Sequence, residues 1–242
     1  MAKVELVNNV DHKDVKIITT RSEAFGDNVM YSMTFPSEFR SVQAYYPIFF
    51  QKAPDTGRFY PVTLFGFEDQ ENLFLTEQGW DAGYIPLIHR RQPFLIGLQQ
   101  DQPDEQGQPQ RMLQIDMDNP RVSKEEGEAL FLEYGGNSEF LDRIADMMEA
   151  VHHGVQDNTT FIDALVANDL IEPFTLEVQL NDGSKHQLVG FFTINEEKLR
   201  ELDEENLKGM FEKDYLQAIY MMLASQGRIR DLLNRKNAKL GL

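Results

Sequence analysis

Hydrophobic periodicity changes near residue 137, and this change constrains the fold more than any other feature of the chain. Before that point, apolar residues fall in short, strand-length runs bounded by turn residues. After it, they recur at helical spacing, as Phe140, Leu141, Ile144, Met147, Met148 and Val151. The chain is therefore predicted to be α+β, with a strand-rich antiparallel N-terminal half and a helix–hairpin–helix C-terminal half.

The N-terminal half is predicted to begin with an irregular lead-in over residues 1–35. One short strand is expected inside it, at Val15–Thr19. Five further runs of strand length follow, at residues 42–50, 60–67, 73–76, 94–98 and 112–117. The first two are expected to pair as a hairpin around Ala53-Pro-Asp-Thr-Gly57, because Pro fixes φ and Gly accepts positive φ.

Residues 99–110 contain no apolar side chain. A segment that buries nothing cannot offset the entropy lost on ordering, so a mobile loop is predicted there. No linker separates the two halves, and residues 36–242 are expected to form a single domain that includes this loop.

Helix caps and a turn divide the C-terminal half. Asn137 or Ser138 is expected to cap the first helix and Asn158 a second one. Residues 175–180 and 187–194 flank Asn181-Asp182-Gly183, which predicts a hairpin. Three helices then follow, with Asn195 and Asp203 as caps of the first two and an interruption at Gly227 in the last.

Charge limits the classes of partner. The chain carries 40 acidic and 23 basic residues, a net charge of −17. Such a surface repels phosphate, so binding to nucleic acid is not expected, although residues 228–242 are locally basic. Those cations are expected to complement a helix end and the acidic body. The start of the chain lacks a secretory pattern and no apolar run is long enough for a membrane span, which predicts a cytoplasmic protein.

Residues for metal or covalent chemistry are sparse. The chain has no cysteine, and its five histidines show no ligand spacing. His152 and His153 are expected at a helix end. Asp116 and Asp118 share a strand face, but Asn119-Pro120 follows where a calcium loop would continue. Nucleophile-elbow and phosphate-loop motifs are absent, and Gly135-Gly136 is expected to be a turn, so no metal and no cofactor is predicted.

Recognition chemistry is densest around the single tryptophan. The candidate ligand- or partner-binding residues are Trp80, Asp81, Tyr84, Arg90 and Arg91, in a segment punctuated by Pro86 and Pro93. Rings supply contact area, and arginine grips a carboxylate through two hydrogen bonds. The alternative is an aromatic core edge whose arginines pair with some of the many carboxylates.

Ten motifs follow one another in order along nearly the whole chain: Tyr46-Pro-Ile-Phe-Phe50, Phe59-Tyr-Pro-Val-Thr-Leu-Phe-Gly66, Glu71-Asn-Leu-Phe-Leu75, Gly79-Trp-Asp-Ala-Gly-Tyr-Ile-Pro86, Arg90-Arg-Gln-Pro-Phe-Leu-Ile-Gly97, Ile115-Asp-Met-Asp-Asn-Pro-Arg121, Gly127-Glu-Ala-Leu-Phe131, Leu170-Ile-Glu-Pro-Phe174, Leu180-Asn-Asp-Gly-Ser-Lys-His186 and Gly190-Phe-Phe-Thr-Ile194. In these motifs the chain resembles the bacterial SapC family. The resemblance implies an S-layer-related role, or a role beside nutrient receptors and flavin-dependent halogenase-like enzymes. It identifies no catalytic residues.

Two classes of function remain open. The first is a non-catalytic accessory protein that binds a protein, peptide or small molecule and serves nutrient uptake, peptide or glycan modification, or the S-layer. The second is an enzyme with a site of Asp, Arg and Tyr. The absence of every standard catalytic signature favours the first.

Overall fold

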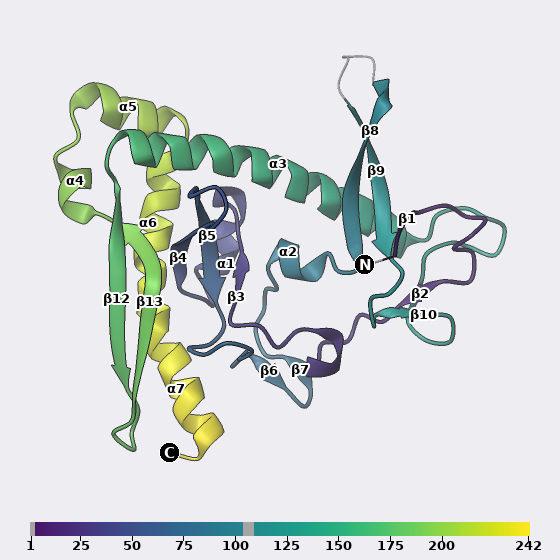
Figure 1. Cartoon of the computed structure of the whole chain (residues 1–242), viewed down its shortest axis with the longest axis horizontal. Coiled ribbons are helices and arrows are strands. Elements are labelled where there is room, and N and C mark those ends of the chain that lie inside the picture. The colour runs from purple at the N-terminus through teal and green to yellow at the C-terminus, as the bar shows by residue number, and fades with distance from the viewer. Residues whose placement is uncertain (1–2, 104–108) are drawn as a thin grey trace. The chain divides into compact units, whose positions relative to one another are not determined.

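A computed structural model describes residues 3–103 and 109–242, and for residues 100–103 and 109 only the backbone. The chain folds as two compact units, each made of two segments. The first unit comprises Met1–Gly26 and Leu87–His153, and the second comprises Asp27–Pro86 and Gly154–Leu242 (Figure 1). The prediction of one domain over residues 36–242 concerns how these units associate, and it stays a prediction.

The first unit contains two small antiparallel sheets. One has the order β1-β9-β8, from β1 (Val4–Leu6), β8 (Phe94–Pro103) and β9 (Pro109–Asp116). The other has the order β10-β2-β11, from β2 (Lys16–Ile17), β10 (Val122–Ser123) and β11 (Glu128–Ala129). The 3₁₀ helix η1 (Glu23–Phe25), the short helix α2 (Leu87–Arg90) and residues 139–153 of α3 complete the unit. Its core is apolar, with Phe94 and Ile115 fully buried.

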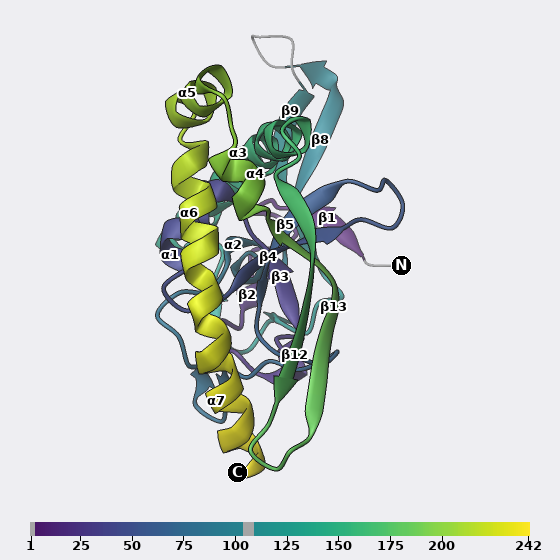
Figure 2. The same ribbon diagram turned by 90° about the vertical axis from the view of Figure 1, so that its left-hand side faces the viewer.

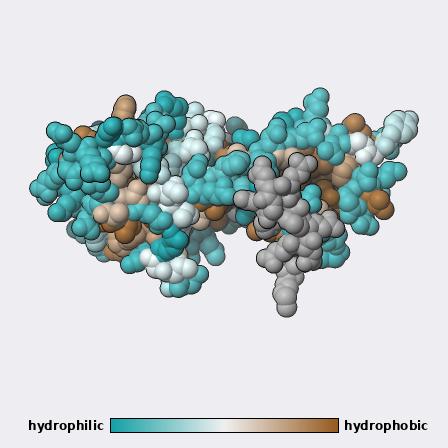
Figure 3. Space-filling view, turned by 90° about the horizontal axis from the view of Figure 1, so that it is seen from above, coloured by the Kyte–Doolittle hydropathy of each residue, from teal (hydrophilic) through white to brown (hydrophobic). Residues whose placement is uncertain are grey.

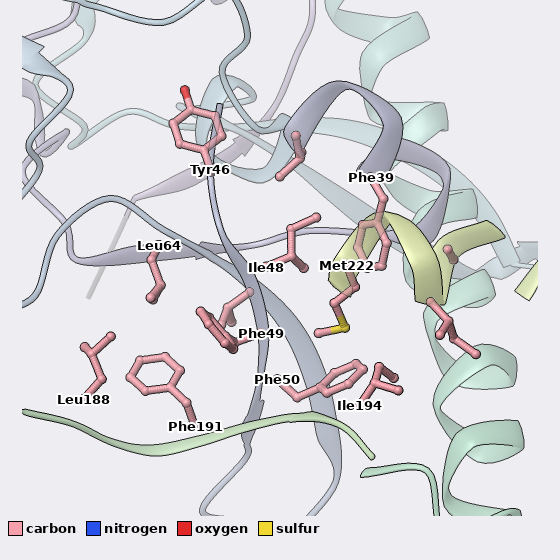
Figure 4. Packing of buried hydrophobic residues seen from close by; sticks show 14 of the residues in the cluster. Phe39, Tyr46, Ile48, Phe49, Phe50, Leu64, Leu188, Phe191, Ile194 and Met222 are labelled. Carbon is pink, nitrogen blue, oxygen red and sulfur yellow. The ribbon is translucent and has the colours of Figure 1, made fainter. Parts of the chain in front are cut away.

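The second unit is built on a five-stranded antiparallel sheet of order β12-β13-β4-β5-β3. The strands are β3 (Tyr31–Met33), β4 (Ile48–Lys52), β5 (Phe59–Leu64), β12 (Ile171–Gln179) and β13 (Lys185–Ile194). Ile48, Phe49 and Phe50 in β4 are all fully buried (Figure 4). Successive strand residues point to opposite faces, so both faces of β4 are covered. Phe49 stacks on Phe174, with 4.6 Å between the ring centroids.

Helices and a small hairpin complete the second unit. They are η2 (Pro36–Glu38), α1 (Phe39–Val42), residues 154–167 of α3 (Glu139–Ala167), α4 (Glu196–Arg200), α5 (Glu204–Glu212), α6 (Tyr215–Ser225), η3 (Gln226–Arg228), α7 (Ile229–Leu240), and the strands β6 (Leu75–Thr76) and β7 (Gly79–Trp80). Figure 2 shows α6 and α7 following one another alongside the β12–β13 hairpin.

The α+β class and the antiparallel pairing predicted from the sequence are confirmed. The hairpin around Asn181-Asp182-Gly183 is present, and Asn195 and Asp203 cap α4 and α5 through bonds from Lys198 N and Asn206 N. Gly227 lies in η3 between α6 and α7, as predicted. Local chemistry decides these features, because a turn or cap depends on a few adjacent residues.

Three predictions about elements need correction. The two helices expected before residue 168 are one, α3, a single helix of 29 residues. Asn158 is therefore no cap, and its Nδ2 donates to the carbonyl of Thr34 at 3.1 Å. The strand expected at residues 42–50 is shorter than predicted and begins at Ile48. Val42 belongs to the helix α1 instead. His152 and His153 lie inside α3 and not at a helix end.

The ends of other predicted segments also differ. The lead-in contains β1 and β3 besides the expected strand at Lys16–Ile17. The predicted loop over residues 99–110 is shorter, since 99–103 belong to β8 and 109–110 to β9. The rest of it, residues 104–108, lies outside the described residues, as does the predicted mobility there.

Candidate functional site

The hairpin formed by β6 and β7 carries the single tryptophan on the second unit. Leu75 pairs with Trp80 and Thr76 with Gly79. The Thr76 hydroxyl donates to the Gly79 carbonyl at 3.0 Å and accepts from Gln78 N at 3.2 Å, which closes the turn. Gly79 has a φ of 109°, which a residue with a Cβ adopts only with strain. The backbone around Trp80 is thus fixed by short-range bonds.

A hydrogen bond to Tyr46 fixes the position of the Trp80 ring. Trp80 Nε1 donates to the Tyr46 hydroxyl at 2.7 Å, and that hydroxyl donates to the Tyr84 carbonyl at 2.5 Å. Figure 4 shows the Tyr46 hydroxyl pointing away from the labelled apolar side chains. The Phe65 ring meets Trp80 edge-on, with 5.0 Å between centroids. Burial raises the pKa of Tyr46 well above its ordinary value, so this hydroxyl stays protonated and keeps donating.

A buried carboxylate fixes the side chain of Tyr84. The Tyr84 hydroxyl donates to Glu38 Oε1 at 2.9 Å, and Thr34 Oγ1 donates to Glu38 Oε2 at 3.0 Å. Glu38 is buried. Buried polar groups are tolerated when hydrogen-bonded in this way. Tyr84 therefore has a structural bond and is not a free acid or base at the surface.

Asp81 pairs with Arg235, an arginine that was not predicted from the sequence to belong to the site. Arg235 in α7 meets Asp81 Oδ2 at 2.7 Å through one nitrogen and the Asp81 carbonyl at 3.2 Å through another. The guanidinium also lies 4.4 Å from the centroid of the Phe74 ring. The cluster of basic residues near the C-terminus was the feature of the sequence that could have indicated Arg235. For Arg235, the expectation that these cations complement the acidic body is met by the pair with Asp81.

A hollow of about 570 Å³ opens at this hairpin. Residues 76–81 line it, and they include Trp80 and Asp81 but not Tyr84. Its volume falls in the range of small-ligand sites. Trp80 is half-buried, whereas Glu77, Gln78 and Asp81 are exposed. The site thus combines one anchored ring with carboxylate and amide groups.

The two candidate arginines belong to the first unit. Arg91 donates to the Phe94 carbonyl, and burial lowers the pKa of Arg91. Arg90 is exposed, and its backbone carbonyl accepts from Arg21 at 3.3 Å. The second unit therefore contains Trp80, Asp81 and Tyr84, whereas Arg90 and Arg91 belong to the first unit. A surface common to all five residues stays a prediction.

Residues considered for a metal have other roles. Asp118 Oδ2 accepts from Lys3 N at 3.0 Å, and Asp116 Oδ1 accepts from Asp118 N at 3.1 Å. The second of these bonds closes the turn after β9, and the first joins that turn to the N-terminal segment. Over residues 3–103 and 109–242, no three His, Asp or Glu side chains are grouped so that they could hold a metal ion. In the same ranges no helix has the length and apolarity needed to cross a membrane.

Comparison with known proteins gives one result. No curated protein and no solved structure matches the chain. The model of one family, described as SapC, matches residues 7–232 of the 242. That match includes the hairpin with Trp80, the two candidate arginines Arg90 and Arg91, and the start of α7 up to Leu232. The chain belongs to the SapC family.

Proposed function

We propose that this protein is a non-catalytic binding protein and that the hollow at the β6–β7 hairpin takes a neutral, hydroxyl-rich ligand, a glycan. The observation that carries the proposal is the anchoring of Trp80 in a polar hollow. Its Nε1 donates a hydrogen bond to the Tyr46 hydroxyl and its ring packs against Phe65 in a T-shaped arrangement, so the ring does not have to be ordered when a ligand arrives.

The chemistry of the lining selects the ligand class. A tryptophan ring offers a flat apolar surface, which suits the C–H face of a pyranose. Around it, Glu77, Gln78 and Asp81 supply oxygen acceptors, and Gln78 also supplies an amide donor. Sugar hydroxyls both donate and accept, so they match this mixture.

Charge argues against an anionic ligand in this hollow. Glu77 and Asp81 both line it, and the whole chain has a net charge of −17. The nearby cation, Arg235, is already paired with Asp81 at 2.7 Å. An added phosphate or carboxylate would meet repulsion there, whereas a neutral ligand would not.

The contacts favour binding over catalysis. An enzyme with an Asp, Arg and Tyr site needs those groups aimed at one reacting atom. Here Asp81 is engaged by Arg235, and the Tyr84 hydroxyl donates to buried Glu38. A glycan ligand also agrees with the roles that the family resemblance implies, which are nutrient uptake, peptide or glycan modification and S-layer association.

Calorimetric titration tests the proposal. We expect saturable heat with at least one member of a panel of soluble oligosaccharides built from glucose, galactose or N-acetylglucosamine. Trp80→Ala should weaken that binding at least roughly tenfold, because the stacking surface is lost. Gln78→Ala, in the exposed turn, should weaken it without disturbing the core.

A charge-matched pair supplies the control. Glu77→Gln alters the lining of the hollow, whereas Glu212→Gln makes the same change on α5, where Glu212 pairs with Lys208 at the surface. Binding should change in the first and not in the second. Absence of heat across the panel, or equal binding by wild type and Gln78→Ala, would contradict the proposal.

A further inference from the structure

A second hollow, of about 630 Å³, lies elsewhere in the second unit, among η2, α1, α3 and the start of α6. Its charged lining comes from Arg40, Asp157, Lys213 and Asp214. None of these residues belongs to the hairpin that carries Trp80. The volume is again that of a small-ligand site.

Tyr215, which lines this hollow, is fixed by a hydrogen bond and by ring packing. Tyr215, at the first position of α6, donates its hydroxyl to Thr160 Oγ1 at 3.0 Å. Its ring packs on buried Phe161, with 5.3 Å between centroids and an interplanar angle of 67°. Ala218, one turn later in α6, is buried and also lines the hollow. A ligand here would meet a preformed surface.

The charges around the hollow do not neutralise one another. Two are cations and two are carboxylates, yet in the part of the chain that the structure describes none of the four forms an ion pair within 4.0 Å. Elsewhere on this unit, exposed cations such as Arg58, Lys185 and Arg200 do have carboxylate partners. Arg40 belongs to α1 and Asp157 to α3, whereas Lys213 and Asp214 are neighbours in the turn between α5 and α6.

We propose that this hollow binds a small zwitterion, a free amino acid or a short peptide. The ligand carboxylate would pair with Arg40 and its ammonium group with Asp157, and Lys213 and Asp214 would add one further charge of each sign to the lining. Arginine and carboxylate groups form charge-assisted hydrogen bonds, which are about twice as strong as neutral ones. A ligand with one charge of each sign satisfies both halves of the lining, whereas a simple anion or cation satisfies one and is repelled by the other.

Thermal unfolding in the presence of ligands tests this proposal. The probes are the common free amino acids, a set of dipeptides, and the N-acetylated amides of the same amino acids. We expect at least one free amino acid or dipeptide to raise the melting temperature in a saturable manner, since a ligand that binds only the native state stabilises it. The corresponding blocked derivative, which lacks both charges, should have no effect.

Matched variants locate the effect. Arg40→Gln and Asp157→Asn should each weaken binding at least roughly tenfold, as expected for one lost charge-assisted hydrogen bond. Arg200→Gln, on α4, makes the same charge change away from the hollow, and Glu77→Gln alters the glycan hollow instead. Both variants should bind the amino acid or dipeptide as the wild type does. The proposal is overturned if no member of the panel raises the melting temperature, if blocked derivatives act equally, or if Arg40→Gln binds unchanged.

Discussion

Lys236 and Glu71 form a buried ion pair in the second unit. Lys236 Nζ lies 2.7 Å from Glu71 Oε1 and 3.3 Å from Glu68 Oε1, and the side chains of Lys236 and Glu71 are only 6% and 8% exposed. Glu71 Oε2 accepts from Phe67 N at 3.0 Å. Desolvation makes such a pair expensive to build, but removing one partner is worse because the other charge is left buried.

Lys236→Met is therefore expected to lower the free energy of unfolding by about 3–5 kcal/mol. The double variant Lys236→Met with Glu71→Gln should recover part of that loss, because the amide oxygen still accepts from Phe67 N and no buried charge remains. Urea denaturation of the three proteins measures the difference. A single variant within about 1 kcal/mol of wild type, the size of a surface change, would show that water reaches the pair.

The pH dependence of the same pair has a definite sign. Burial alone lowers the pKa of Lys236, but the hydrogen bond and charge of Glu71, with those of Glu68, outweigh it and raise the pKa above 10.5. A raised pKa adds stability that is fully present below 10.5 and is lost as the pH rises through the folded-state value. The difference in the free energy of unfolding between the wild type and the double variant should therefore narrow as the pH rises into the alkaline range. A gap that closes between pH 6 and pH 8 would contradict this assignment.

At the scale of elements, α3 shows what the sequence could and could not predict. The cap Ser138, whose Oγ accepts from Leu141 N at 3.1 Å, was predictable because capping is local. The continuity of the helix past Gly154 and Asn158 was not, since it depends on contacts with residues more than a hundred positions away. Gly154 packs against Phe35, and Asn158 bonds Thr34.

In the candidate site, too, features set by neighbouring residues could be predicted and features set by distant residues could not. Trp80 and Asp81 could be chosen because aromatic and charged residues stand together in a short segment. Tyr46 and Arg235, which hold these two residues, could not, because 34 and 154 positions separate the bonded partners. No periodicity or motif records such a pairing.

Two glycine variants test the account of α3. Gly154→Ala should destabilise the protein although alanine favours helix by about 1 kcal/mol, because its Cβ would lie 2.6 Å from the Phe35 ring. Gly209→Ala, in α5, meets nothing within 4 Å, so the propensity gain should appear there as added stability. Thermal unfolding compares the two. Stabilisation by Gly154→Ala would contradict the packing against Phe35.

At the scale of the whole molecule, acidic charge dominates. Figure 3 shows hydrophilic side chains over most of the visible face. The net charge is −17, and two cations of the basic C-terminal segment, Arg235 and Lys236, are already paired with carboxylates. Little positive potential is left to attract phosphate.

We therefore expect no shift of a DNA duplex or of single-stranded RNA in a gel assay at physiological salt. Neutralising phosphates releases counterions, so true binding would fall steeply as salt rises. A complex that forms at low salt and disappears on raising the salt concentration would contradict the prediction and point to the unpaired cations of α7.

The fluorescence of the single tryptophan shows whether a glycan binds at the β6–β7 hairpin. Trp80 is the only tryptophan in the chain and lines the proposed glycan hollow, so its emission reports on that place alone. We predict a saturable change in intensity or emission maximum with the same oligosaccharide that gives heat on titration, and with the same midpoint. Saturable heat that leaves the emission of Trp80 unchanged would contradict the account, since the ligand would then bind elsewhere.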